Sequence, residues 1–348
     1  MGIFDNFFKE VGIDLGTANS LVYQKNRGLV LNEPTVVAIN NKTMEILAIG
    51  EKAKKMLGRT PEHISVVRPL VNGVISDFDM TQEFLRQLIK RLNRSSELWG
   101  VRHAVLSVPD DLTEVERKSV EDAAIQAGCG KVHLMSAPMA VAIGAGLPID
   151  EPTASLIVDI GGGTTDIAVI SLGGTVIYKT LKIGGDRFND DIIKFVRDEF
   201  KMAIGEPTAE FAKIAAGSAI PMDEKLDVAI RGMDLSTGLP KEVLIKNNQI
   251  RAAISKSLRS MIDSIKEIIE STPPELAGDM LKQGIHLSGG GALLRGLDNL
   301  IERETSVETK IIDDPLTASV RGLGFVAENL EHYKRFLANP MRPLDISL

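Results

Sequence analysis

The clearest indication of a fold is LIVDIGGGTTDIAVI at residues 156–170, which reads as a buried strand, a glycine turn and a second strand. Thr175 to Tyr178 supplies a third strand. The same plan occurs near the N-terminus, where VGIDLGTANSLVY at residues 11–23 gives two strands and Gly28 to Leu31 offers a third. Two units of one design predict a duplicated domain.

Helical patterns follow each of these units. Apolar residues recur with a helical period over residues 84–92, and Val101 to Val108 then reads as a buried strand. In the second half, one apolar stripe covers residues 188–196, and a longer one covers residues 250–269 before Pro273-Pro274. Strands grouped with helices in two halves predict an α/β protein with layered sheets.

Two further segments read as helices rich in alanine and glycine. They are PMAVAIGAG at residues 138–146 and DPLTASVRGLGFVA at residues 314–327. Small residues let helices approach closely, so these segments suit crossovers between the two halves. Two ordinary packed helices are the alternative.

The composition narrows the range of functions. With 348 residues and 44% apolar residues, the chain has room for two or more packed domains. A net charge of −7 and the lack of a basic run with interleaved aromatic residues argue against nucleic-acid binding. The single cysteine, Cys129, excludes an internal disulfide and a cysteine-based zinc site, and the five histidines never fall at ligand spacing.

The chain is expected to be cytoplasmic. It has no run of 18 apolar residues, and its N-terminus lacks the features of a signal peptide. Met1 to Phe8 nevertheless carries apolar residues at helical spacing, in the sequence MGIFDNFF. Such a stripe suits a lipid surface. Packing on the protein body and disorder are the alternatives.

The two glycine turns suit the phosphates of a nucleotide. A glycine turn presents backbone N–H groups with no Cβ in the way, so residues 12–17 would hold one end of a triphosphate and residues 161–165 the other. Carboxylates repel phosphates, so Asp14 and Asp159 beside these turns predict a divalent cation between them and the phosphates. The expected ion is Mg²⁺, which would keep most of its bound water molecules.

A third glycine turn, LSGGGAL at residues 287–293, is expected to lead into a helix whose N-terminus faces the base or ribose. The chain matches neither the GxxxxGK[ST] P-loop nor the GxGxxG dinucleotide fingerprint. Three unrelated structural turns are the alternative to a nucleotide site.

These motifs resemble those of the MreB family of bacterial actins, which belongs with actin, sugar kinases and heat-shock chaperone ATPases. The matching segments are GIDLGTANS at 12–20, DIGGGTTDIAVIS at 159–171, GGDRFNDDI at 184–192, IRGMDLSTGLPK at 230–241 and LSGGGALLRGLDNL at 287–300. Together they span essentially the whole chain. The resemblance implies an actin-like, ribonuclease H-like duplicated α/β fold of two domains around a nucleotide cleft, with ATP and Mg²⁺ as ligands.

The resemblance also implies four subdomains. Subdomain IA would comprise residues 1–32, 77–145 and 316–348; IB, residues 33–76; IIA, residues 146–182 and 251–315; and IIB, residues 183–250.

The resemblance further implies a set of site residues. The expected nucleotide-binding residues are Gly16, Thr17, Ala18, Asn19, Gly161, Gly162, Gly163, Thr164, Gly185, Glu210, Lys213, Gly289, Gly290 and Ala292. Asp14 and Asp159 would hold the metal, mainly through water. Glu210 and Lys213 would line the adenine and ribose pocket, and a surface ion pair between these two residues is the alternative.

One departure from the family pattern concerns catalysis. Relatives carry I-E-E-P-M or N-E-P-T where this chain has MSAPM at 135–139, and a glutamate there is thought to orient the attacking water. Since Ser136 and Ala137 have no carboxylate, nucleotide binding with weak or lost ATPase activity is expected. Asp159, Thr164 and Asp166 are candidates for a residual role.

The resemblance implies self-assembly into protofilaments, paired as antiparallel double filaments at the inner face of the cell membrane. The membrane contact would use Met1 to Phe8, Leu98-Trp99 or both, although Trp99 also suits a buried position. Other cytoskeletal or morphogenesis proteins are expected partners, and the role would be in cell shape or, in wall-less cells, movement. Three alternatives stay open: a non-polymerising nucleotide-binding adaptor, a small-molecule kinase of the same superfamily and a chaperone ATPase.

Overall fold

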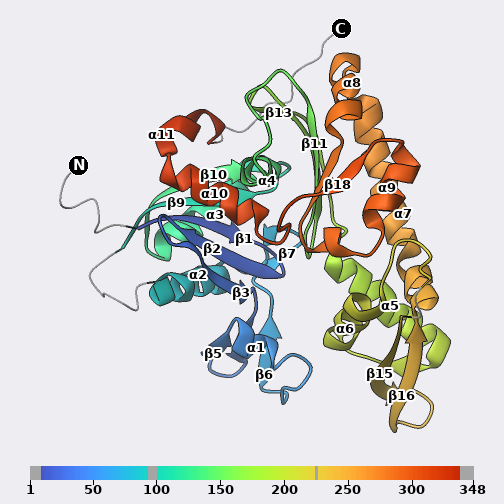
Figure 1. The fold of residues 1–348 in the computed structure, drawn as a ribbon. Coiled ribbons are helices and arrows are strands. Elements are labelled where there is room, and N and C mark those ends of the chain that lie inside the picture. The colour runs from blue at the N-terminus through green and yellow to red at the C-terminus, as the bar shows by residue number, and fades with distance from the viewer. Residues whose placement is uncertain (1–8, 93–99, 224–225, 338–348) are drawn as a thin grey trace.

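The computed structural model describes residues 9–92, 100–223 and 226–337, drawn in colour in Figure 1. The predicted membrane contacts at Met1 to Phe8 and at Leu98-Trp99 lie outside these residues. None of the helices in the described ranges is long and apolar enough to cross a membrane.

A five-stranded sheet forms the centre of the N-terminal half. Its strands are β1 Lys9–Leu15, β2 Asn19–Gln24, β3 Gly28–Pro34, β9 Val101–Val108 and β10 Cys129–Ser136. β1, β2 and β3 form an antiparallel meander, whereas β9 and β10 run parallel to β1 on its other side.

A second five-stranded sheet forms the centre of the other half and has the same topology. Its strands are β11 Ser155–Ile160, β12 Thr165–Ser171, β13 Gly174–Leu181, β17 Ile285–Ser288 and β18 Thr309–Ile311. β11, β12 and β13 form the meander, and β17 and β18 lie parallel to β11. The duplicated α/β design predicted from the two glycine units is therefore confirmed.

Helices pack against each of the two sheets. The first sheet packs against α2 Phe78–Leu92 and α3 Glu114–Gln126, and the second against α7 Asn247–Ser271, α8 Pro274–Gln283 and α9 Leu297–Thr305. The predicted long stripe corresponds to α7, and its end before the two prolines follows from the missing N–H of proline.

Two smaller parts extend the halves at the lower end of the view in Figure 1. One contains β4 Val37–Asn40, β5 Ile46–Ile49, β6 Ile64–Val67 and α1 Glu51–Lys54. The other contains α5 Gly185–Phe200, β14 Met202–Ala203, α6 Glu206–Ala216, β15 Asp227–Asp234 and β16 Pro240–Lys246. The short pair β7 Leu70–Val71 and β8 Val74–Ile75 leads from β6 to α2. The residue boundaries of the four subdomains stay a prediction.

The helices α4 Ala137–Gly144 and α10 Ala318–Glu328 lie between the two sheets, and α11 Leu330–Tyr333 follows them. Their apolar residues share one cluster with Val105 of the first sheet and Ile157 of the second. The predicted helix over residues 314–327 begins only at Ala318, because residues 314–317 form a turn in which Asp314 has a φ of 47°.

Glycine permits the close crossing of α4 and α10. A Cβ at Gly322 would overlap the carbonyl oxygen of Ala140, and a Cβ at Gly144 would overlap the carbonyl oxygen of Ala318. Both obstacles are backbone atoms, which cannot move aside as the end of a side chain can. The small residues noticed in both segments therefore serve a tight helix crossing that joins the two halves.

This crossing gives a stability test. Gly322→Ala should lower the free energy of unfolding by about 2 kcal/mol, because overpacking against backbone outweighs the helix propensity gained with alanine. The matched control is Gly278→Ala in α8, where an added Cβ would meet nothing within 4 Å. This variant should gain about 0.5–1 kcal/mol. Urea denaturation of both variants measures the difference, and equal stabilities would contradict the role of the crossing.

Candidate functional site

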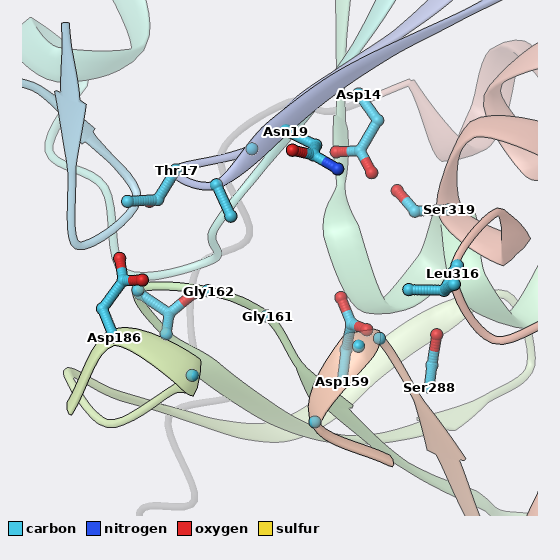
Figure 2. A pocket seen from close by; sticks show the side chains of 18 of the residues that line it. Asp14, Thr17, Asn19, Asp159, Gly161, Gly162, Asp186, Ser288, Leu316 and Ser319 are labelled. Atoms are coloured by element: carbon cyan, nitrogen blue, oxygen red, sulfur yellow. The ribbon is translucent and has the colours of Figure 1, made fainter. Parts of the chain in front are cut away.

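A cavity of about 660 Å³ lies where the glycine turns of the two halves meet. Its walls come from the β1–β2 turn, the β11–β12 turn, the turn after β17, and the helices α5 and α6. Figure 2 shows Asp14 and Asn19 on one side of this space and Asp159 with Ser288 on the other.

Most of the predicted site residues line this one cavity. They are Asp14, Gly16, Thr17, Ala18, Asn19, Ala137, Asp159, Gly161, Gly162, Gly163, Thr164, Gly185, Glu210, Lys213, Gly289 and Gly290, together with Asp166. Ala292 is not among them, since it is fully buried in the apolar core of the second half. Ser136 is buried behind the wall beside Ala137.

The two glycine turns touch each other. A Cβ built on Gly162 would lie 2.6 Å from the Cβ of Ala18, and one built on Gly163 would lie 2.8 Å from the Oγ1 of Thr17. Neither position has room for a side chain, so glycine is needed for this close approach. The backbones of both turns thereby meet in the wall of one cavity.

Two carboxylates face each other across the cavity, at the ends of β1 and β11 (Figure 2). Ser107 of β9 donates a hydrogen bond of 2.7 Å to Asp14. Burial raises the pKa of Asp14. Burial, followed by the negative charges of Asp166 and Asp14, raises the pKa of Asp159 to about 7.

This arrangement fits a magnesium ion. A cation between Asp14 and Asp159 would offset their repulsion, and Mg²⁺ is bound by one or two carboxylates together with phosphate and water oxygens. Among the described residues, no group of three or more histidine, cysteine, aspartate or glutamate side chains could hold a metal. Phosphate oxygens of a bound ligand would complete the coordination of such an ion.

A third carboxylate, Asp166, lies opposite Asp159 in the β11–β12 register. It accepts hydrogen bonds from Thr164 at 3.0 Å and from Thr180 at 2.6 Å. Burial raises the pKa of Asp166 to about 6, although both hydrogen bonds oppose that rise.

Ionic contacts connect the smaller parts across one end of the cavity. Arg68 pairs with Asp186 at 2.9 Å and also with Glu206. Lys54 pairs with Glu210 at 3.6 Å, while Lys213 donates a hydrogen bond of 2.8 Å to the carbonyl oxygen of Gly185. Glu210 and Lys213 thus have other partners, while the charge of Glu210 also acts on Lys213. The alternative of an ion pair between them stays a prediction.

The third glycine turn differs from its prediction. After Gly289, whose φ is 78°, the chain makes a 3-10 helix over Gly290–Leu293, and α9 begins only at Leu297. A Cβ on Gly289 would lie 2.6 Å from the carbonyl carbon of Ile160, so the turn is pressed against β11. The cavity therefore meets a glycine-rich short helix here and not the N-terminus of a long one.

Several residues of the site were not predicted from the sequence. Ser107, Ser288, Ser319 and Leu316 line the cavity near the two aspartates, and Asp186 lies at its other end (Figure 2). Ser107 near the end of β9 and Ser319 near the start of α10 carry no nucleotide-binding motif of their own. Ser288 belongs to LSGGGALLRGLDNL and Asp186 to GGDRFNDDI, and these two segments were the available signals.

The buried carboxylates give a second stability test. In the nucleotide-free protein at pH 8, Asp159→Asn should raise the free energy of unfolding by on the order of 2 kcal/mol, because a pKa near 7 in the folded state lies above the ordinary value of 3.8. The folded state takes up this proton as the pH falls through 7, so the gain should shrink between pH 7 and pH 4.

Thermal unfolding across that pH range measures the effect of Asp159→Asn. Asp313→Asn, at an exposed position, serves as the control and should change stability by less than about 0.5 kcal/mol. A gain independent of pH, or a loss at pH 8, would contradict an ionised and repelled carboxylate.

Comparison with solved structures identifies the fold. MreB5 of Spiroplasma citri bound to AMPPNP superposes with a TM-score of 0.89 at 37% identity, covering 94% of this chain and 98% of that one. The same protein bound to ADP gives a TM-score of 0.88 at 38% identity, over 93% and 98% of the two chains. A MamK double helical filament shares the fold, with a TM-score of 0.78 at 22% identity over 92% and 99%.

Comparison of sequences gives the same answer. The cell shape-determining protein MreB of Escherichia coli (strain K12) is 44% identical over 334 residues, 95% of either chain. The cell shape-determining protein Mbl of Bacillus subtilis (strain 168) is 40% identical over 93% of this chain and 97% of that one. The family model described as MreB/Mbl protein matches residues 8–335. This chain is an actin-like protein that belongs to the MreB/Mbl family.

Proposed function

We propose that this protein binds Mg²⁺-ATP in the cavity between its two halves and assembles into filaments that act in cell shape or, in a wall-less cell, in movement. The observation that carries the proposal is the contact of the two glycine turns beside two partly buried carboxylates. Relatives that are solved with ADP and AMPPNP support the nucleotide, and the names of the curated relatives support the role in cell shape.

Different residues would bind the phosphates and the metal ion. Backbone N–H groups of Gly16 to Asn19 and of Gly162 to Thr164 would hold the phosphates from opposite sides. The N–H group of Gly161 donates to the carbonyl oxygen of Thr164 and closes the second turn. Asp14 and Asp159 would hold Mg²⁺, largely through water, and this ion would offset the charge of the phosphates. Because the two turns belong to different halves, a phosphate chain between them would hold the halves in one relative orientation.

The adenosine would occupy the other end of the cavity. Gly185, Glu210 and Lys213 line this side from α5 and α6, and Gly289 and Gly290 line it from the turn after β17. Ala292, which is buried in the core, would support that turn from behind and not touch the nucleotide.

Hydrolysis is expected to be slow. Ala137 is the wall residue next to the phosphate turns, and neither it nor Ser136 carries a carboxylate. A positioned base contributes about 10²- to 10⁴-fold to such a reaction, whereas binding does not depend on it. The protein would therefore stay in the ATP-bound state for longer than a relative that has the glutamate.

Filaments and membrane are the proposed partners. Self-assembly into protofilaments is supported by the double helical filament of MamK, which has the same fold. Antiparallel pairing of the protofilaments is proposed from the family resemblance alone. The contact with the inner face of the membrane would use Met1 to Phe8, Leu98-Trp99 or both, and other cytoskeletal or morphogenesis proteins would bind the assembled filament.

The contact of the two turns gives a test of binding and assembly together. Gly162→Ala should lower the affinity for AMPPNP at least about tenfold, because its Cβ would separate the turns. It should also abolish nucleotide-dependent filaments. Gly174→Ala, in β13, is the control, since its Cβ would meet only a carbonyl oxygen at 3.9 Å.

Calorimetry and negative-stain microscopy with and without liposomes measure these properties. Filaments in the Gly162→Ala protein at wild-type level would contradict the proposal. Nucleotide binding by the wild type without filaments would favour a non-polymerising adaptor, and consumption of ATP only with an added sugar or acetate would favour a kinase.

Slow hydrolysis has its own test. Ala137→Glu should raise phosphate release at least about tenfold, because this side chain would place a carboxylate in the cavity wall. Phosphate release is compared with that of a relative that carries the glutamate. A wild-type rate equal to the rate of that relative would contradict the prediction.

A further inference from the structure

A partly buried carboxylate that belongs to none of the predicted motifs, Asp110, lies next to Pro109 in the cavity wall. Asp110 follows the end of β9, and Ser136 is the last residue of the neighbouring strand β10. The hydroxyl group of Ser136 donates a hydrogen bond of 2.8 Å to the Oδ2 atom of Asp110. The two residues therefore form a serine–carboxylate pair across two parallel strands.

This pair lies against the phosphate side of the cavity. Pro109 and Ala137, the chain neighbours of Asp110 and Ser136, both line the cavity. Pro109 and Thr164 flank the same glycine, because a Cβ on Gly73 would lie 3.1 Å from the Cγ of Pro109 and 3.2 Å from the Cγ2 of Thr164. The end of β9 thus meets the second glycine turn, where the terminal phosphate of a triphosphate would lie.

The charges around Asp110 suit a base. Burial raises the pKa of its carboxyl group and the charge of Asp111 adds to the rise, whereas the hydrogen bond from Ser136 and the charge of Arg117 oppose it. Arg117 of α3 binds the backbone carbonyl oxygen of Asp110 at 3.0 Å, which fixes the turn. Asp166 is close enough for the negative charges of Asp111 and Asp110 to raise its pKa.

We propose that Asp110, held by Ser136, is the carboxylate that orients and deprotonates the water attacking the terminal phosphate of a bound nucleoside triphosphate. This inference rests on the proposed binding of ATP and goes beyond it, since it assigns the base for the slow hydrolysis. Ser136, which lacks a carboxylate of its own, is here a positioning residue that aims the carboxylate of its neighbour.

The chemical step balances with water as the only co-reactant. The water oxygen forms a bond to the γ-phosphorus, and the bond from that phosphorus to the oxygen bridging to the β-phosphate breaks. The proton of the water passes to the carboxylate of Asp110. The products are the nucleoside diphosphate and inorganic phosphate.

The first measurement is phosphate release by the full-length protein with Mg²⁺-ATP. Asp110→Asn should lower the rate about 10- to 100-fold, whereas affinity for AMPPNP stays within twofold of the wild type. The wild-type rate should rise with pH as Asp110 loses its proton, and the variant should lose this rise. The matched control is Asp111→Asn, an exposed neighbour with the same charge, which should stay within twofold.

The second measurement does not depend on turnover. A group that orients the attacking water contacts the analogue formed by ADP and aluminium fluoride, which carries a water in that place, but not AMPPNP. Asp110→Asn should therefore lower the affinity for ADP with aluminium fluoride about tenfold or more, as measured by calorimetry. The double variant Asp110→Ser with Ser136→Glu, which returns a carboxylate to the neighbouring strand, should recover at least part of both losses.

Each outcome decides between the proposals. Equal rates in the wild type and Asp110→Asn, or equal losses in Asp110→Asn and Asp111→Asn, would overturn the role of Asp110 as the base. Binding of AMPPNP by a wild type that releases no phosphate would overturn it too, while the proposed function would stand. If the wild type bound no nucleotide, both would fall. Circular dichroism of each variant separates loss of the base from loss of the fold.

Discussion

The contact between the two glycine turns is the constraint on which the rest of the structure depends. Gly162 lies against Ala18, and Gly163 lies against Thr17, with no room for a side chain at either glycine. This contact brings the turns of two separate sheets to one place. Any shift between the halves would open the contact, so the proposed binding of a phosphate chain would be coupled to the orientation of the halves.

The crossing of α4 and α10 between the sheets holds the two glycine turns in contact. α4 directly follows β10 of the first sheet, and α10 leads back from the second half to the first. Gly144 and Gly322 let the two helix backbones touch, which leaves little freedom for sliding. A rigid crossing behind the cavity and ion pairs of Arg68 at its open end together define how far the halves can separate.

The electrostatics of the cavity oppose stability and favour function. Asp14, Asp159 and Asp166 line the same cavity, Asp166 being buried and the other two partly buried, and each has a raised pKa. Buried like charges destabilise a fold unless a ligand neutralises them, and clusters of this kind are typical of functional sites. Asp110, at the end of β9, is a further carboxylate with a raised pKa, and it accepts a hydrogen bond from the hydroxyl group of Ser136.

The sequence alone determined the two strand–turn–strand units, the α/β class and the aspartates before the glycine turns, because these follow from local periodicity and from the backbone freedom of glycine. The pairing of Ser136 with Asp110, 26 residues apart, and of Ser107 with Asp14, 93 residues apart, was decided by tertiary structure. The turn at residues 314–317, which delays α10, was decided in the same way. Strand order and register determine which chain segments become neighbours. A local sequence pattern does not reveal strand order or register.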